Sequence, residues 1–272
     1  KLRYATATPV ASFGVIIVST HPVLVEVYRG QAVESQHRGS VAVIDADGRI
    51  VLELGDIETP VFPRSAVKAF QALPLVESGI ADRFGLTDEE LALAISSHSG
   101  EPRHAETALG ILKKAGKDQT CLECGAHWPS DKTAERALAA AGQKPSALHN
   151  NCSGKHSGFI CLACGLDEDP EGYIKPDHRV QREIRAAGEE ITGFRVREEW
   201  TGTDGCSIPT YAVPLKNLAH GFAKLGTGAG LGPERAKAAA QLRRAAAAHP
   251  FMVAGTGRLD TVAMEIFGQR LF

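Results

Sequence analysis

The sequence predicts an α/β fold of the α+β kind, with an antiparallel sheet built from N- and C-terminal strands and flanked by helices. Three observations support this prediction. Alternating apolar residues and a hairpin signal at Asp45–Gly48 lie near the start of the chain. The middle of the chain has capping signals and Ala-rich helical segments. A strand-like run returns late, at Ser207–Val213, so the terminal parts are expected to share one sheet with a helical lobe inserted between them.

Each predicted element rests on a local pattern. Strands are predicted at Val23–Tyr28, Ser40–Asp45 and Arg49–Leu54. Thr87 and Glu90 form a capping box that starts a short apolar helix, and Gly79 ends the long helix before it. The segment His249–Asp260 is predicted to be a glycine-rich loop. Helices are predicted at Ser65–Ser78, Leu91–Ile95, Pro102–Ala115, Asp131–Ala141, Gly154–Cys164, Asp177–Ile191, Pro214–Lys224 and Glu234–Ala248.

Length and composition describe an ordinary globular protein. The chain has 272 residues, of which 43% are hydrophobic and 23% charged, and its net charge is -2. This balance predicts no binding to nucleic acid or to an anionic membrane surface. No apolar run approaches the roughly 20 residues that a membrane span needs. The 6 cysteines do not resemble a secreted disulfide framework in a chain this long, which favours a reducing, cytoplasmic setting.

The domain organisation follows from the same patterns. Residues 1–20 show no clear pattern and are set apart as an N-terminal segment. Residues 21–272 are predicted to form a single domain, whose inserted helical lobe covers about residues 80–190. No internal repeat or low-complexity tract divides this part of the chain.

Reactive side chains are concentrated in the stretch from His149 to Phe159. Ser153 is a good N-cap, so Cys152 is expected just outside a helix N-terminus, where the helix dipole favours a thiolate. Lys155 and His156 follow in the first turn, beside that sulfur. A polar loop that only caps a buried helix is the alternative, but few surface loops gather so many reactive groups.

Two serine-containing segments with candidate roles precede this stretch. Ser65 and Lys68 form a Ser-x-x-Lys pair at a helix start, and their spacing places both side chains on one face. A lysine whose pKa is lowered by burial can take the serine proton. The Ser-x-x-Lys spacing alone is weak evidence, because a chain of this size is expected to contain about one by chance. Ser97 and Ser99 lie where an apolar helix ends. A simple turn between helices, capped by Ser99, is the alternative there.

The cysteines suggest a metal site in two ways. The Cys-x-x-Cys pairs that begin at Cys121 and Cys161 have the spacing of zinc ligands, but they are too far apart for a compact zinc module. The second pair also falls inside a predicted apolar helix, where cysteine serves as a small core residue. Cys152 and Cys206 are better candidates, because each lies in a polar, glycine-containing loop.

Taken together, these motifs resemble those of a known family. The matching segments are Pro63–Gln71, Ser97–Glu101, His149–His156, Asp204–Cys206 and Met252–Arg258. As an ordered set they resemble the Rhizobium-etli-type L-asparaginases, also called class 3, over nearly the whole chain from about Pro22. The resemblance implies a fold similar to serine β-lactamases and penicillin-binding proteins. It also implies an enzyme that hydrolyses L-asparagine to L-aspartate and ammonia, and a homodimer.

The resemblance assigns catalytic roles residue by residue. It makes Ser65 and Lys68 one Ser-Lys tandem and Ser97 the serine of a second. The lysine of that second tandem belongs, in the family, to a Lys-x-Gly segment that would follow Phe272. A serine activated by lysine attacks the side-chain amide and forms an acyl-enzyme, which water then hydrolyses. Which of the two serines attacks is left open by the sequence.

The resemblance also implies a metal site and charged groups around the substrate. Cys152, Lys155 and Cys206 are the implied ligands of Zn²⁺, with water completing the site. Lysine is an unusual ligand because it must be neutral, and zinc itself can displace its proton. The implied substrate-binding residues are Arg64, Glu101, His156 and Asp204. Among these, the arginine suits the α-carboxylate of asparagine, and one of the two acids suits its α-ammonium group.

Two other functions are compatible with parts of the sequence. A penicillin-interactive serine hydrolase is favoured by Ser-x-x-Lys and by Gly255–Gly257, a loose match to the Lys-Thr-Gly strand of that class. The cluster around Cys152 argues against it. The other alternative is a non-enzymatic zinc-binding protein, in which the cysteines only hold the fold together.

Overall fold

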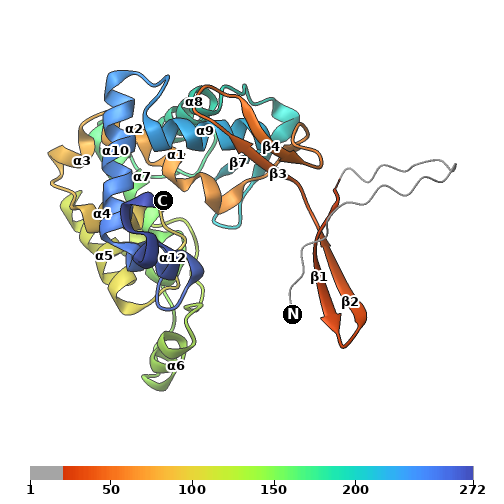
Figure 1. Ribbon diagram of the computed structural model, residues 1–272. Helices are drawn as coiled ribbons and strands as arrows, with labels where there is room; N and C mark the ends of the chain where they lie inside the picture. Colours follow the sequence, from red (N-terminus) through yellow and green to blue (C-terminus); the bar gives the residue numbers. More distant parts are fainter. Residues whose placement is uncertain (1–20, 272) are drawn as a thin grey trace, which may run out of the picture.

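Helices make up most of the computed structural model, and short strand pairs lie at one side of the helical body (Figure 1). The structure describes residues 21–271. The predicted N-terminal segment, residues 1–20, therefore lies outside the described residues. The mixed α/β class and the antiparallel strand pairing that the sequence predicts are both present.

The strands form antiparallel pairs. They are β1 (Val23–Arg29) with β2 (Ala32–Arg38), β3 (Val41–Ile44) with β4 (Ile50–Leu54), β5 (Pro60–Val61) with β8 (Val213–Pro214), and β6 (Thr201–Thr203) with β7 (Pro209–Tyr211). The predicted hairpin turn joins β3 to β4, where the Asp45 main-chain N–H donates to the Arg49 carbonyl at 3.0 Å. Gly48 in this turn has φ 82°, a conformation that favours glycine.

The single sheet expected from the sequence is not formed by the described strands, which pair two by two. Among them, β5 comes from early in the chain and pairs with β8 from late in the chain, with Val61 opposite Val213. The β1–β2 hairpin projects away from the helices (Figure 1). Every residue of β2 is exposed and most are polar, so this strand of the hairpin has no face buried against the core.

The helices follow the predicted order. Their bounds are α1 (Lys68–Gln71), α2 (Leu73–Glu77), α3 (Ile80–Arg83), α4 (Asp88–Ala94), α5 (Pro102–Lys114), α6 (Lys132–Ala140), α7 (Ser153–Gly165), α8 (Arg179–Thr192), α9 (Leu215–Thr227), α10 (Pro233–Ala248), α11 (Pro250–Val253) and α12 (Leu259–Phe267). The long helix predicted from Ser65 is divided into a 3₁₀ turn, Arg64–Val67, followed by α1 and α2. The predicted loop His249–Asp260 contains α11 and leads into α12, which the sequence patterns did not predict.

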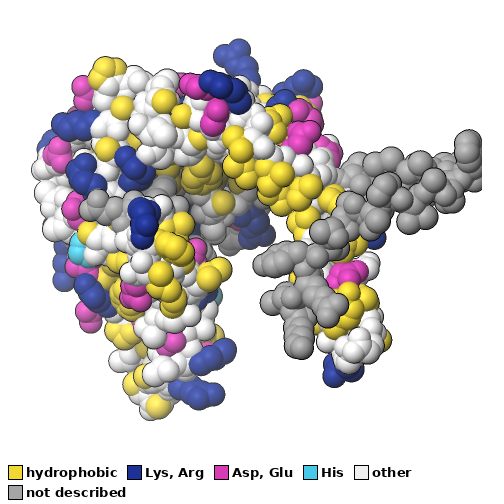
Figure 2. Space-filling view, viewed as in Figure 1, with side chains coloured by type: hydrophobic (Ala, Val, Ile, Leu, Met, Phe, Trp, Pro, Cys, Tyr) yellow, Lys and Arg dark blue, Asp and Glu magenta, His cyan; other side chains and the backbone are white. Residues whose placement is uncertain are grey.

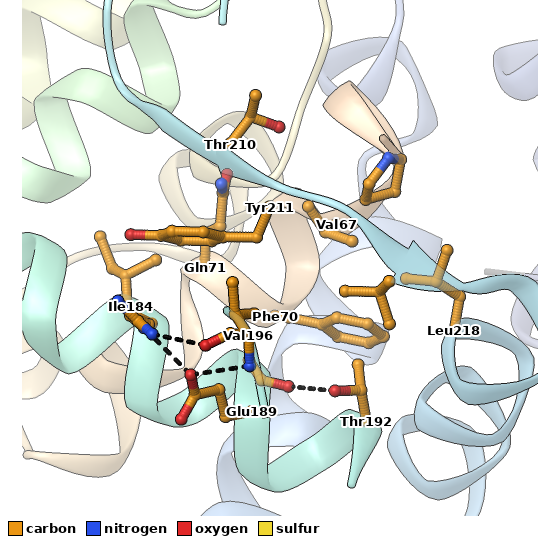
Figure 3. Close-up of a pocket in the computed structure, with 14 residues that line it drawn as sticks. Val67, Phe70, Gln71, Ile184, Glu189, Thr192, Val196, Thr210, Tyr211 and Leu218 are labelled. Atoms are coloured by element: carbon orange, nitrogen blue, oxygen red, sulfur yellow. Dashed lines mark hydrogen bonds and ion pairs between the residues drawn. The ribbon is translucent and has the colours of Figure 1, made fainter. Parts of the chain in front are cut away.

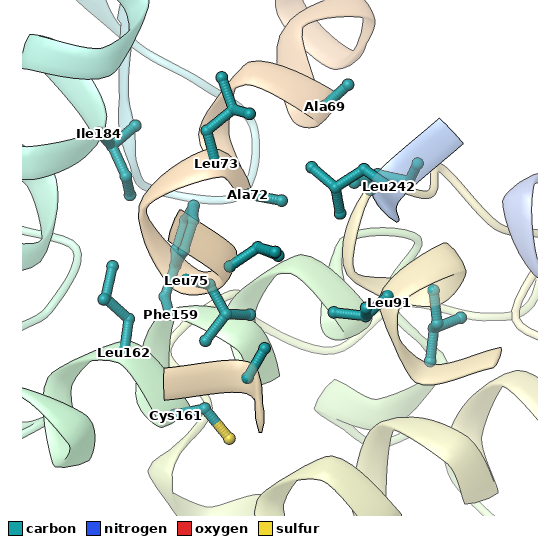
Figure 4. Close-up of a cluster of buried hydrophobic side chains, with 14 of the residues drawn as sticks. Ala69, Ala72, Leu73, Leu75, Leu91, Phe159, Cys161, Leu162, Ile184 and Leu242 are labelled. Carbon is teal, nitrogen blue, oxygen red and sulfur yellow. The ribbon is translucent and has the colours of Figure 1, made fainter. Parts of the chain in front are cut away.

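Helix α7 is the centre of the core. Nearly all its residues are buried, and leucine side chains from α2 and α4 meet it on different sides (Figure 4). At Gly154 a Cβ atom would lie 2.3 Å from the Leu93 carbonyl oxygen, so α4 and α7 pack backbone against backbone. Each fully buried leucine contributes about 1.5–3 kcal/mol to folding. This packing fixes the N-terminus of α7, where Cys152 and Lys155 lie.

Apolar side chains also gather on the surface, over β3–β4 and over α12 (Figure 2). The exposed residues of these two patches are Val43, Ile50, Val51, Leu52, Leu54, Leu259, Val262, Ile266 and Phe267. Within residues 21–271, no helix has the length and apolar character needed to cross a membrane.

Candidate active site

A cavity of about 380 Å³ brings together two of the predicted catalytic serines. Ser65 belongs to the 3₁₀ turn before α1, and Ser97 follows α4. The Ser97 hydroxyl donates a hydrogen bond to the Ser65 Oγ atom, at 3.4 Å. The other lining residues are Ala66, Ala69, Ile95, Phe222, Ala246, Val253, Ala254, Arg258, Asp260 and Met264. The volume suits a small molecule, and the wall combines apolar side chains with the two serines and two charged residues.

Ser97 is held in place by two other segments. The Asn151 side-chain amide donates to the Ser97 Oγ atom at 2.9 Å, and the Ser97 main-chain N–H donates to the Val253 carbonyl at 3.1 Å. The Asn151 main-chain N–H in turn donates to Nε2 of His127 at 3.0 Å. A directed chain of hydrogen bonds thus runs from Asn151 through Ser97 to Ser65. The sequence reasoning assigned no role to Asn151, although it lies inside the central motif.

Lys68 follows Ser65 by three residues and is buried, with 1% of its surface exposed, and it does not line the cavity itself. Its Nζ atom donates to the main-chain carbonyls of Ser96 and, at 3.3 Å, Asn151. Burial lowers the pKa of Lys68 to about 8, and the positive charge of Lys155 adds to this effect, while Cys152 opposes it. A substantial fraction of Lys68 is therefore neutral at slightly alkaline pH and can accept a proton.

The three predicted metal ligands also lie together. Cys152 is the N-cap residue of α7 and Lys155 lies in its first turn, while Cys206 comes from the loop between β6 and β7. The Lys155 Nζ atom is 3.1 Å from the Cys206 Sγ atom. Both cysteines are 4% exposed, and both are free thiols. We refer to these three residues as the thiol cluster.

The thiol cluster favours a thiolate at one position. A hydrogen bond from Cys206, together with the nearby Lys155 charge, lowers the pKa of Cys152 to about 5. The same hydrogen bond and burial raise the pKa of Cys206, so one sulfur carries the charge and the other the proton. Two sulfur atoms and one amine nitrogen facing one another are a donor set that suits Zn²⁺.

His156 lies behind the thiol cluster and does not line the serine cavity. It is completely buried, and its Nδ1 atom is 2.6 Å from the Tyr173 hydroxyl. That hydroxyl also accepts a hydrogen bond from the Glu123 main-chain N–H, at 2.9 Å. The other ring nitrogen of His156, Nε2, has no partner among the described residues. Burial, with the charges of Lys155 and Lys68, holds the pKa of His156 well below its usual value.

Two of the predicted substrate-binding residues are paired with each other. The Arg64 guanidinium lies 3.1 Å from the Asp204 carboxylate, with 68% of the arginine side chain and 11% of the aspartate side chain exposed. Both line a hollow of about 210 Å³, next to the turn that carries Ser65. Arg64 has φ 50°, which costs a non-glycine residue about 1–3 kcal/mol. The turn that presents Ser65 thus holds a strained residue anchored by this ion pair.

Glu101 is already bound to protein groups. Its Oε1 atom accepts hydrogen bonds from the Ser99 hydroxyl at 2.7 Å and the Thr256 main-chain N–H at 2.8 Å. Its Oε2 atom accepts from the Thr256 hydroxyl at 2.7 Å. Burial alone would raise the pKa of Glu101, but these hydrogen bonds outweigh burial and lower it. Glu101 therefore ties the glycine loop Gly255–Gly257 to the segment that carries Ser97.

A second, much smaller cavity borders the α1 segment, at Phe70 and Gln71 (Figure 3). Its volume is about 40 Å³, and apolar side chains from α1, α8 and β7 line most of it. Glu189 faces this space but already accepts hydrogen bonds from Arg185, at 3.0 Å, and from the Val196 main-chain N–H, at 3.1 Å. This cavity is too small for an amino acid and contains none of the predicted site residues.

Two serine hydroxyls in a cavity of small-molecule size, with a buried lysine three residues after one of them, are chemically suited to acyl transfer. A family model described as L-asparaginase II matches residues 25–272, which include all the segments described above. The chain belongs to the L-asparaginase II family. A search of curated proteins finds no match to this chain.

Proposed function

We propose that this protein is an L-asparagine amidohydrolase of the Rhizobium-etli-type class. The observation that carries the proposal is the serine pair, whose Oγ atoms lie 3.4 Å apart in the cavity. Lys68, whose pKa is lowered to about 8, follows Ser65 by three residues and donates to the main-chain carbonyl of Ser96, the residue before Ser97. Membership of the L-asparaginase II family supports an enzyme that hydrolyses asparagine. It does not favour a penicillin-interactive hydrolase or a purely structural zinc protein.

Ser65 is the proposed nucleophile, because its oxygen accepts the last hydrogen bond of the chain from Asn151 through Ser97, which leaves its own proton available to a base. Neutral Lys68 is the proposed base that takes the serine proton as Ser65 Oγ bonds to the amide carbon. The carbon–nitrogen bond then breaks, and ammonia leaves with that proton. Water hydrolyses the resulting ester and releases L-aspartate. Ser97 orients Ser65 and relays protons between the groups.

The thiol cluster is the proposed zinc site of the enzyme. The donor set supports this role, since the Lys155 Nζ atom lies 3.1 Å from the Cys206 Sγ atom and Cys206 is hydrogen-bonded to Cys152. A bound Zn²⁺ would supply a fixed positive charge and neutralise the thiolates. Because Lys155 belongs to α7 and Cys206 to the β6–β7 loop, the three ligands would tie the core helix to the loop that carries Asp204. That loop in turn fixes Arg64 and the serine turn.

For the molecule as a whole, we propose one catalytic domain with a serine β-lactamase-like arrangement and a helical lobe at about residues 80–190. The pairing of β5 with β8 and the helical segment that carries Ser65 and Lys68 support this arrangement. A cytoplasmic homodimer completes the proposal, and light scattering of the purified protein tests the dimer.

Ammonia release tests the function directly. The protein is incubated with L-asparagine, L-glutamine and an asparagine-containing dipeptide, and with a reporter cephalosporin in parallel. We expect ammonia from L-asparagine and no cephalosporin hydrolysis. Cephalosporin hydrolysis without ammonia would identify a penicillin-interactive hydrolase. Bound zinc without either activity would identify a structural zinc protein.

A further inference from the structure

The charged groups around the serine cavity differ in whether they have partners. Arg64 and Asp204 neutralise each other, and Glu101 already accepts three hydrogen bonds. Arg258 and Asp260 also line the cavity, and their side chains make no ion pair or hydrogen bond with another described residue. An opposite-charge pair that faces a cavity without protein partners is available to a ligand that carries both charges.

The position of these two residues suits recognition of such a ligand. Arg258 is the N-cap residue of α12, and Asp260 lies in its first turn, so both project from one short segment at the cavity rim. Phe222, Met264 and Val253 supply apolar wall beside them. A cavity whose wall mixes apolar and polar groups orients its ligand through its charged side chains.

We propose that Arg258 and Asp260 determine specificity for a free amino acid, with Arg258 binding the α-carboxylate and Asp260 the α-ammonium group. This inference rests on the proposed function, because it places the side-chain amide at the serine pair on the opposite part of the same cavity. An arginine binds a carboxylate through two parallel hydrogen bonds, and an aspartate accepts from an ammonium group. A peptide-bound asparagine lacks both charges and is excluded.

Binding of three ligands tests the assignment. L-aspartate carries both groups, succinate lacks the ammonium group, and β-alanine lacks the α-carboxylate. Affinities are measured by calorimetry for the parent protein and for Arg258→Gln and Asp260→Asn. Arg270→Gln and Glu265→Gln are matched controls, because both side chains are exposed nearby and neither lines the cavity.

We expect Arg258→Gln to weaken binding of L-aspartate and succinate about 10- to 100-fold, with β-alanine changed less than about threefold. Asp260→Asn should weaken L-aspartate and β-alanine to a similar extent and leave succinate unchanged. The controls should bind as the parent does. The inference is overturned if either variant loses affinity equally for all three ligands, or if it loses less than threefold for L-aspartate. It is also overturned if the parent protein binds none of them.

The ammonia assay on the parent protein separates this inference from the proposed function. If asparagine is hydrolysed but both variants bind as the parent does, the inference fails and the function stands. If no amide is hydrolysed but the binding pattern holds, the function fails and the cavity remains an amino-acid site.

Discussion

The serine cavity and the thiol cluster are neighbours that are built in different ways. Ser65 and Ser97 lie at the surface of an open cavity and are held by a few hydrogen bonds between loops. Cys152 and Lys155 are buried at the start of α7, and core packing on several sides fixes them. Core packing thus fixes the α7 side of the cluster, whereas the cavity depends on contacts between separate segments.

Lys68 connects the two regions. It is buried with the thiol cluster, and the charges of Cys152 and Lys155 shift its pKa in opposite directions. Its proposed task, however, is in the serine cavity. The comparison therefore predicts that changes in the cavity affect chemistry with little loss of stability, while changes in the cluster affect the shape of the whole site.

The largest expected effect comes from Ser65→Ala. Removing the nucleophile should lower kcat/KM for L-asparagine by at least about a thousandfold. Because Ser65 is exposed and caps no helix, the free energy of unfolding should change by less than about 1 kcal/mol. Steady-state ammonia release and urea unfolding measure both quantities. Ser40→Ala, remote from the cavity, is the control, and activity within tenfold of the parent would rule out the nucleophilic role.

The pH dependence of the rate tests Lys68 as the base. Since its pKa is lowered to about 8, the neutral fraction falls about tenfold for each pH unit below that value. The log of kcat/KM should therefore rise with unit slope up to about pH 8 and level off above it. The same shift makes the unfolded chain bind more protons between pH 8 and 10.5, so stability should increase across that range. A flat rate profile from pH 6 to 9 would exclude Lys68 as base.

Removal of a zinc ligand tests the thiol cluster. Cys206→Ala should lose bound zinc and lower kcat/KM about 10- to 100-fold, mainly through KM, because the loop that carries Asp204 is released. Cys161→Ala is the matched control, since Cys161 is a fully buried core thiol away from the cluster. Metal content is measured by mass spectrometry on both variants. Full activity of a zinc-free Cys206→Ala protein would show that the metal has no part in the site.

The difference between the two regions also explains what could be predicted from the sequence. Cys152 and Lys155 lie within one helical turn, so the local pattern was enough to place them at the start of α7. Local patterns also predicted most helices and the β3–β4 hairpin. The contact between Ser65 and Ser97 joins separate segments, and only the family resemblance placed both serines in one site.

Other features escaped prediction for physical reasons. Strand β2 is polar and wholly exposed, so it lacks the alternation that identifies a half-buried strand. Helix α12 follows Gly255 and Gly257, and glycines at this spacing favour a loop. The exposed apolar residues of α12 also leave it without the clear polar face that identifies a surface helix. Arg258 and Asp260 were not proposed as binding residues, because their availability depends on which other charges are already paired in the fold.

The smallest expected effect on activity, and the most local test of the cavity, is that of Gly255→Ala. Gly255 has φ 119°, and a Cβ atom there would lie 2.0 Å from the Ser99 Oγ atom and 2.6 Å from the Glu101 Oε1 atom. We expect a loss of about 2–4 kcal/mol in the free energy of unfolding, because backbone strain and steric overlap add. Activity should fall less than about tenfold, since Ser97 retains its hydrogen bond from Asn151.

Gly257→Ala is the matched control for this substitution. Gly257 also has positive φ, at 66°, but a Cβ atom there meets open space, so its cost should be only about 1–2 kcal/mol of backbone strain. Urea unfolding of both variants isolates the contribution of the contact between the glycine loop and Ser99. Equal losses in the two variants would mean that backbone conformation alone matters at this loop. The link through Glu101 and Thr256 would then not be what holds the loop against the serine segment.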